Sequence, residues 1–244
     1  MYFLALAFLI LTNHESGWHE EGWIDLSGSE GFAAWRASGN WYRTNEVTLK
    51  SGNTRLLDGK NTGGPILVNS PSGRTVNLVS KAKFKDVEFN CDFLMGEKSN
   101  SGVKFIGHYE IQLFDSYGKK ESEMTGSDCG GVYPRGESQP RYHTIDRGTA
   151  PKVNVCRKPG EWQSLQIVFR APRYDAQGKK VEHARFVRVT MNGTVIQENV
   201  ELRFPTGSAW RKSKEVPEGP ILLQGDHGPV AFRNIKVRPL SEAR

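Results

Sequence analysis

Residues 185–200 read RFVRVTMNGTVIQENV, and this stretch decides the fold class. Residues 185–191 and 195–200 mix apolar and polar side chains in the alternating manner of strands with one buried face. Asn192-Gly193 separates them, and a type I′ hairpin turn favours Asn-Gly because both central residues need positive φ. The stretch therefore predicts an antiparallel hairpin. Asn192-Gly193-Thr194 is also a glycosylation sequon, but we favour the turn.

Strand-like patterns recur on both sides of this hairpin. Segment 87–94 is the clearest, since Val87, Phe89, Cys91 and Phe93 alternate with polar residues. Other expected strands lie in 40–49, 53–57, 102–106, 109–114, 162–170, 220–224 and 230–237. Residues 63–74 are expected to form a loop, and 116–149 to be mostly irregular. Without a convincing helical period or internal repeat, these strands predict an all-β, two-sheet antiparallel β-sandwich of the jelly-roll type.

The first residues suggest export. The apolar run 2–11 has the length of a signal-peptide core and is too short to span a bilayer. We therefore expect residues 1–16 to be a signal peptide or its remnant, and the protein to be periplasmic or extracellular. Residues 22–240 are expected to form a single domain without a further membrane span.

Composition argues against a nucleic-acid partner and leaves two states possible for the cysteines. The net charge of +6 comes from scattered basic residues rather than a basic stripe interleaved with aromatics, which argues against nucleic-acid binding. Of Cys91, Cys129 and Cys156, the last two are the preferred disulfide pair, and three separate buried thiols are the alternative. No motif for an organic cofactor is present.

Residues 109–115, YEIQLFD, carry the first candidate site. Glu110 and Gln112 share one strand face and Asp115 follows, so a carboxylate and an amide could meet a sugar in an open concavity. Lys104 on a neighbouring strand could pair with Glu110 and tune its pKa or stabilise a negative intermediate. The competing interpretation is an ordinary solvated face with a weak cross-strand ion pair.

Two loops supply further candidates. Gln224 ends an expected strand and His227 lies in the glycine-flanked loop that follows, where a histidine can act as acid, base or ligand. Tyr133 and His143 lie in the long irregular segment, which could form a lid or a sugar-binding rim. An exposed histidine and a poorly ordered insertion are the plain alternatives. A divalent metal stays open, because Glu110, Asp115, His143 and His227 could converge, although their spacing does not itself predict a metal site.

Several strings together resemble the 3-keto-disaccharide hydrolase family. They are NSGVKFIGHYEIQLFDSYG (100–118), VNVCRKPGEWQSLQIVFRAPRYDAQGK (153–179), VTMNGTVIQENVEL (189–202) and GPILLQGDHGPVAFRNIKVRPL (219–240). The resemblance implies a concanavalin A-like jelly roll with a carbohydrate site on its concave sheet. It also implies action on glycosides already oxidised to a ketone at C3.

That resemblance suggests a chemistry and a set of roles. A C3 ketone acidifies the C2 proton, so a base can form an enolate and the C1 substituent leaves by β-elimination, with water addition completing a net hydrolysis. Glu110 or His227 would be the base, and Lys104, Gln112 or a bound metal ion would stabilise the enolate. Asp115 and Tyr133 would orient the sugar or the acid, with His143 and Gln224 as further substrate contacts. The alternative function is a non-catalytic, lectin-like module that uses Trp41, Tyr109 and Tyr133 as aromatic platforms.

Overall fold

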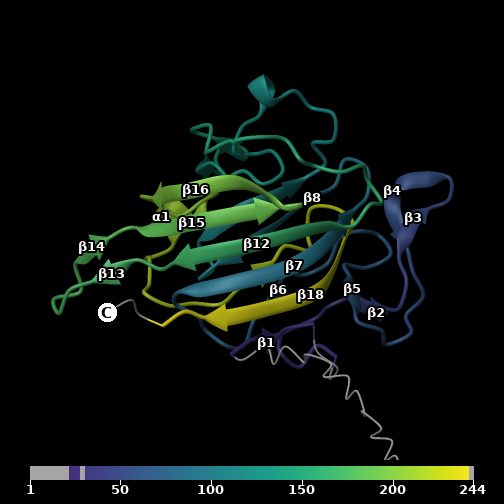
Figure 1. The fold of residues 1–244 in the computed structure, drawn as a ribbon, viewed down its shortest axis with the longest axis horizontal. Coiled ribbons are helices and arrows are strands. Elements are labelled where there is room, and N and C mark those ends of the chain that lie inside the picture. The colour runs from purple at the N-terminus through teal and green to yellow at the C-terminus, as the bar shows by residue number, and fades with distance from the viewer. Residues whose placement is uncertain (1–21, 28–30, 242–244) are drawn as a thin grey trace, which may run out of the picture.

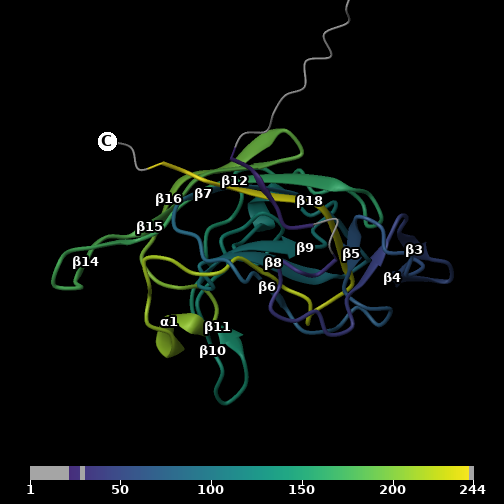
Figure 2. The ribbon, with the colours of Figure 1, turned by 90° about the horizontal axis from the view of Figure 1, so that it is seen from below.

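The computed structural model describes residues 22–27 and 31–241, and nearly all of their regular structure is strand. The expected leader, residues 1–16, lies outside the described residues. Two antiparallel sheets stack face to face, which confirms the predicted β-sandwich with jelly-roll architecture (Figure 1). Figure 2 shows the two layers edge-on, with α1 (Ala209–Lys212) on the outer side of the smaller sheet.

The larger sheet holds most of the strong sequence patterns. Its order is β16-β15-β12-β7-β18-β5-β2, and β1 (Ile24–Asp25) also pairs with β18. The bounds are β16 (Thr194–Leu202), β15 (Ala184–Met191), β12 (Gln163–Arg170), β7 (Val87–Met95), β18 (Val230–Pro239), β5 (Ile66–Val68) and β2 (Tyr42–Thr44).

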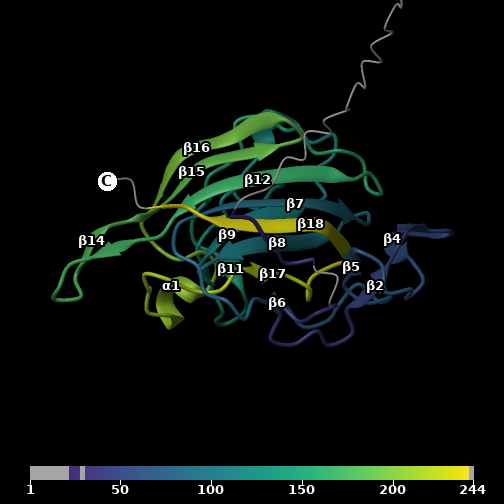
Figure 3. The ribbon, with the colours of Figure 1, turned by 60° about the horizontal axis from the view of Figure 1, so that its bottom comes forward.

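The smaller sheet has the order β6-β17-β8-β9, and these strands follow one another across the second layer in Figure 3. They are β6 (Leu78–Val79), β17 (Leu222–Leu223), β8 (Asn100–Phe105) and β9 (Tyr109–Phe114). Isolated bridges continue the sheet beyond β9, because Val132 pairs with Ile111 on one side and with Thr149 on the other. The irregular segment 116–149 thus adds two short rungs to this layer.

Three short hairpins and a 3₁₀ turn lie outside the two main sheets. They are β3 (Thr48–Lys50) with β4 (Asn53–Asp58), β10 (Gly136–Glu137) with β11 (His143–Thr144), β13 (Arg173–Tyr174) with β14 (Lys180–Glu182), and the 3₁₀ turn η1 (Glu121–Glu123). No helix in the described part of the chain is long and apolar enough to cross a membrane.

The predicted hairpin forms between β15 and β16. Asn192 and Gly193 have φ values of 52° and 81°, as the type I′ turn requires. The Asn192 side chain donates to the carbonyl of Val155 at 2.8 Å and accepts from the amide of Ser164 at 3.0 Å. Asn192 is therefore used by the turn, which agrees with the preference for a turn over a glycosylation site.

Aromatic packing holds the two sheets together. Phe105 of β8 lies against Phe89, Phe169 and Phe186 of the larger sheet, with ring centroids 5.6, 5.0 and 5.7 Å apart. All four side chains are buried. Such rings contribute large apolar areas to a core, and their offset contacts fix how one sheet lies on the other. The face of the smaller sheet that carries Phe105 is thereby committed to the core.

Two expectations need correction. Residues 63–74 are not all loop, because β5 forms within them. Its three residues Ile66, Leu67 and Val68 are buried, so a strand covered on both faces shows no alternation to detect. The preferred Cys129–Cys156 disulfide is absent, and all three cysteines are buried free thiols. A hydrogen bond with the Cys156 thiol, and then burial, raise the pKa of the Cys129 thiol.

Candidate functional site

The candidate site lies on the outer face of the smaller sheet. Successive residues of β9 point to opposite faces, so Tyr109, Ile111 and Leu113 enter the core while Glu110 and Gln112 face outward. Antiparallel register places Lys104 of β8 opposite Glu110. The core side of β9 is hydrophobic and its other side is polar, although both sides are buried.

A hollow of about 280 Å³ opens over this polar face. Six residues singled out in the sequence line it together: Lys104, Glu110, Gln112, Tyr133, Gln224 and His227. The structure adds Asn77, Asn100, Tyr142, Gly207, Ser208 and Asp226. Strands β8 and β9 form its floor, and the loops after β17 and β9 form its walls.

Glu110 and Lys104 form an ion pair at the floor of the hollow. Lys104 Nζ lies 3.1 Å from Glu110 Oε2, and the side chains are 24% and 3% exposed. Burial raises the pKa of Glu110, and the nearby ammonium of Lys104 opposes this without cancelling it. The pair therefore presents a partly accessible cation on a buried carboxylate.

Gly102 makes room for that carboxylate. A Cβ at position 102 would lie 2.2 Å from Glu110 Oε1, and 3.0 Å from Glu110 Cδ and Cγ. Gly102 is the partner of Gln112 in the β8–β9 ladder, so Glu110 lies across the strand over a position that only glycine leaves open.

Gln112 is held by the loop that follows β9. Its backbone amide donates to the carbonyl of Gly131 at 2.9 Å, and its carbonyl accepts from the amide of Gly130 at 2.8 Å. Its side-chain amide donates to Asn100 Oδ1 at 3.2 Å. Asp128 organises this loop, because its buried carboxylate accepts from Lys119 Nζ at 2.7 Å and from the amide of Thr125 at 2.8 Å.

His227 and Asp226 form a second polar pair at the edge of the hollow. His227 Nδ1 lies 2.7 Å from Asp226 Oδ1, and both side chains are about half exposed, at 53% and 47%. An Nδ1–H donated to the carboxylate leaves the lone pair of the neutral ring on Nε2. This is the arrangement by which a carboxylate orients a histidine base.

Gln224 offers an unused acceptor. Its Oε1 atom is buried and lacks a hydrogen-bond partner within the described residues. Buried polar atoms are usually paired, so an orphan acceptor in a polar hollow fits a hydroxyl group supplied by a ligand. On the opposite wall the hydroxyls of Tyr142 and Tyr133 lie 3.2 Å apart.

Two predicted site residues lie elsewhere. Asp115 follows β9 and its carboxylate accepts from the amides of Lys98 and Tyr117, so it fixes a turn outside the hollow. His143 is exposed on β11, where Nδ1 lies 3.1 Å from the carbonyl of Arg141. The four groups proposed to converge on a metal are therefore not gathered. The described residues contain no cluster of three His, Cys, Asp or Glu side chains suited to a metal ion.

The suggested aromatic platforms are partly wrong. Tyr109 is fully buried in the core, and Trp41 is 5% exposed with its indole N–H donating to the carbonyl of Val76. Only Tyr133 reaches the hollow. Tyr142, which is 47% exposed, was missed because its segment shows no regular pattern. Asp226 could have been found, since it directly precedes His227.

Comparisons with known proteins identify the family of this chain. The model of the 3-keto-alpha-glucoside-1,2-lyase-like domain matches residues 22–238. The chain belongs to this family. Membership supports a carbohydrate-active role, and it confirms the resemblance recognised in the sequence. No protein of curated function matches the chain.

Solved structures show the fold of this family member. One provisionally named glycosyl hydrolase from Parabacteroides distasonis ATCC 8503 is 24% identical, with a TM-score of 0.56 over 90% of this chain and 79% of that one. Another from the same strain is 17% identical, with a TM-score of 0.55 over 95% of this chain and 99% of that one. The likeness supports the shared β-sandwich.

Proposed function

We propose that the hollow cleaves glycosides whose sugar ring carries a ketone at C3. The observation that carries this proposal is the meeting of the Lys104–Glu110 pair and the His227–Asp226 pair around one polar hollow. Family membership supports the substrate class. The chemistry needs a base for the C2 proton and a cation or donor for the enolate oxygen, and these two pairs supply both.

His227 is the proposed base. Its ring is accessible from the hollow and Asp226 orients it, whereas Glu110 is buried beneath Lys104. Proton transfer from C2 to Nε2 leaves the electron pair in the C2–C3–O3 enolate, which the Lys104 ammonium stabilises. Collapse of the enolate forms the C1=C2 double bond and breaks the bond from C1 to the leaving oxygen, which takes up a proton. Addition of water across C1=C2 then gives the free 3-keto sugar.

Glu110 is the positioning residue for Lys104. A buried carboxylate 3.1 Å from the ammonium fixes the cation at the floor of the hollow. Gln112 and Gln224 provide an amide and an unpaired acceptor for the sugar hydroxyls. No organic cofactor enters these steps.

The test is release of the sugar from a 3-keto-glucoside and from the same glucoside unoxidised, each with and without chelator. We expect release from the oxidised substrate alone, and a loss of about 100-fold or more in kcat/KM for His227→Asn. Binding of both sugars without release would favour the lectin-like function. A metal requirement would appear as loss of release with chelator.

Two conservative variants separate the two candidate bases. Glu110→Gln removes the charge of the buried carboxylate and keeps its shape, and His227→Asn removes the ring nitrogen that would take the C2 proton. With His227 as the base, Glu110→Gln lowers kcat through the loosened Lys104 and keeps measurable release, whereas His227→Asn abolishes release. The reverse result would transfer the role to Glu110.

Export stays part of the proposal and is supported by the apolar run 2–11. Expression of the full chain in a bacterial host and fractionation of the cells would test it. Recovery of the protein from the cytoplasm alone would argue against export.

A further inference from the structure

Two more hollows adjoin the central one, on opposite sides. The first shares Asn77 and Asp226 with it and has a volume of about 650 Å³. The second shares Tyr133 with it and has a volume of about 230 Å³. We call these the Asn77 hollow and the Arg135 hollow.

The three hollows follow the strand order of the smaller sheet. The Asn77 hollow lies over residues 75–77, directly before β6 at one end of the sheet. The central hollow lies over β8 and β9. The Arg135 hollow lies at the edge of the sandwich, between Val132 and Thr149 on one side and the end of β16 on the other. Shared lining residues join the three hollows in one row, since Asn77 and Asp226 belong to the first two and Tyr133 to the last two. We call this row of hollows the groove.

Each hollow contains one exposed hydrophobic side chain. Val76 is 49% exposed in the Asn77 hollow, Tyr142 is 47% exposed in the central hollow, and Phe204 is 50% exposed in the Arg135 hollow. Polar groups surround each of them. A sugar ring has an apolar C–H face and a hydroxyl edge, so one apolar side chain among polar partners is the pattern that recognises it.

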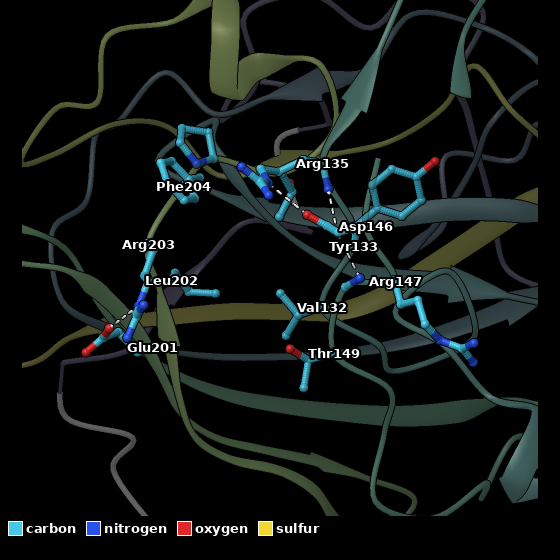
Figure 4. A pocket seen from close by; sticks show the side chains of 13 residues that line it. Val132, Tyr133, Arg135, Asp146, Arg147, Thr149, Glu201, Leu202, Arg203 and Phe204 are labelled. Carbon is cyan, nitrogen blue, oxygen red and sulfur yellow. Dashed lines mark hydrogen bonds and ion pairs between the residues drawn. The ribbon is translucent and has the colours of Figure 1, made fainter. Parts of the chain in front are cut away.

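Ion pairs and ring stacking hold the side chains of the Arg135 hollow in place (Figure 4). Arg135 Nε lies 2.7 Å from Asp146 Oδ2, and its guanidinium lies over the rings of Phe204 and Trp210 at 4.7 and 5.2 Å from their centroids. This stacking fixes Phe204 although half of it is exposed. The Glu201–Arg203 pair forms the facing wall in Figure 4.

We propose that the groove binds a carbohydrate of at least three sugar units, with the ring that reacts in the central hollow and one further unit in each flanking hollow. This deepens and rests on the proposed function, because the central ring is the one that would carry the C3 ketone. A sugar would then be attached on both sides of the reacting ring, and elimination would divide the chain internally. The cleavage step itself is unchanged.

Binding of unoxidised sugars tests this inference without requiring turnover. The probes are glucose di-, tri- and tetrasaccharides in α-1,4, β-1,4 and β-1,6 linkage, measured by calorimetry on the full chain. In all three linkages O3 of the central unit is free, as a C3 ketone there requires. In at least one linkage series we expect affinity to rise by about tenfold from the disaccharide to the trisaccharide, and to rise little for the tetrasaccharide. Equal affinity for two and three units in every series, or no binding at all, would overturn the groove.

Variants of the outer hollows locate the extra units. Phe204→Ala and Val76→Ala should each weaken trisaccharide binding by about fivefold and change disaccharide binding less. The matched control is Tyr117→Ala, because Tyr117 is 51% exposed, lies outside the three hollows and also has a cation, Lys158, near its ring. Loss of affinity in the control equal to that in Phe204→Ala would contradict the assignment.

The binding and cleavage measurements distinguish failure of the groove from failure of the proposed function. A protein that cleaves a 3-keto-glucoside but binds two and three units equally would keep the function and lose the groove. A protein that prefers three units but releases nothing from oxidised sugars would keep the groove and lose the chemistry.

Discussion

The Gly102→Ala substitution tests whether the Glu110 carboxylate has to lie where it does. The new Cβ would lie 2.2 Å from Glu110 Oε1, whereas ordinary contacts begin near 3.4 Å. Oε1 therefore has to retreat by about 1 Å, and because the carboxylate moves as one rigid group, this disturbs the 3.1 Å contact between Oε2 and Lys104 Nζ. The backbone itself accepts alanine, because Gly102 has no positive φ.

The expected effects on catalysis and on stability are of different size. A displacement of about 1 Å in a positioned group costs on the order of 100-fold in rate, or about 2.7 kcal/mol of transition-state stabilisation. Overpacking costs about 1–3 kcal/mol, and the low end applies here because the displaced atoms are at the end of one side chain. We expect kcat/KM on a 3-keto-glucoside to fall about 100-fold, with a loss of only about 1 kcal/mol in the free energy of unfolding.

A double-mutant cycle with Glu110→Ala supplies the control. Removing the Glu110 carboxylate removes the atoms that the new methyl group would meet. Gly102→Ala should then change neither stability nor residual rate in the Glu110→Ala background. Wild-type turnover in the Gly102→Ala single variant would refute the reasoning, and so would an equal loss in both backgrounds.

Three further predictions concern pH and stability. Because burial raises the pKa of Glu110, folding stability should decline as pH rises through that pKa. Lys104→Met should extend this decline to higher pH, because Lys104 lowers the pKa of Glu110. Denaturant midpoints measured against pH would check this, and a variant whose midpoints follow the same pH dependence as the wild type would contradict it. Asp128→Ala should cost about 2 kcal/mol at pH 7 in chemical denaturation. Burial would raise the pKa of Asp128 but Lys119 holds it low, so this difference should shrink as pH falls through the lowered pKa, and a difference that persists in acid would count against the ion pair. Gly193→Ala, at a φ of 81°, should lower the free energy of unfolding by about 1 kcal/mol and leave turnover unchanged.

Local sequence was enough to predict the strands whose two faces differ. Asn192-Gly193 predicted the β15–β16 turn, and the alternation in 87–94 predicted β7. In a half-buried strand, successive side chains face the core and the solvent in turn, so apolar and polar residues alternate. The same rule separated Glu110 and Gln112 from Tyr109 along β9. Motif strings added the family, which periodicity cannot supply.

Tertiary structure decided what depends on contacts between distant segments. β5 carries three buried apolar residues in a row, so its strand state comes from its neighbours β18 and β2. Asp115 follows the site strand, yet its carboxylate bonds to backbone amides of a turn. Tyr142 reaches the hollow from an irregular segment that local sequence does not place.

The site illustrates the same division. Residue type and strand face selected Lys104 and Glu110, but only the register of β8 against β9 set them 3.1 Å apart. Only the fold brought the loop after β17 to the same hollow and left Gln224 Oε1 without a partner within the described residues. Sequence fixes which faces of a strand are polar, whereas the pairing of strands far apart in the chain fixes which polar faces meet.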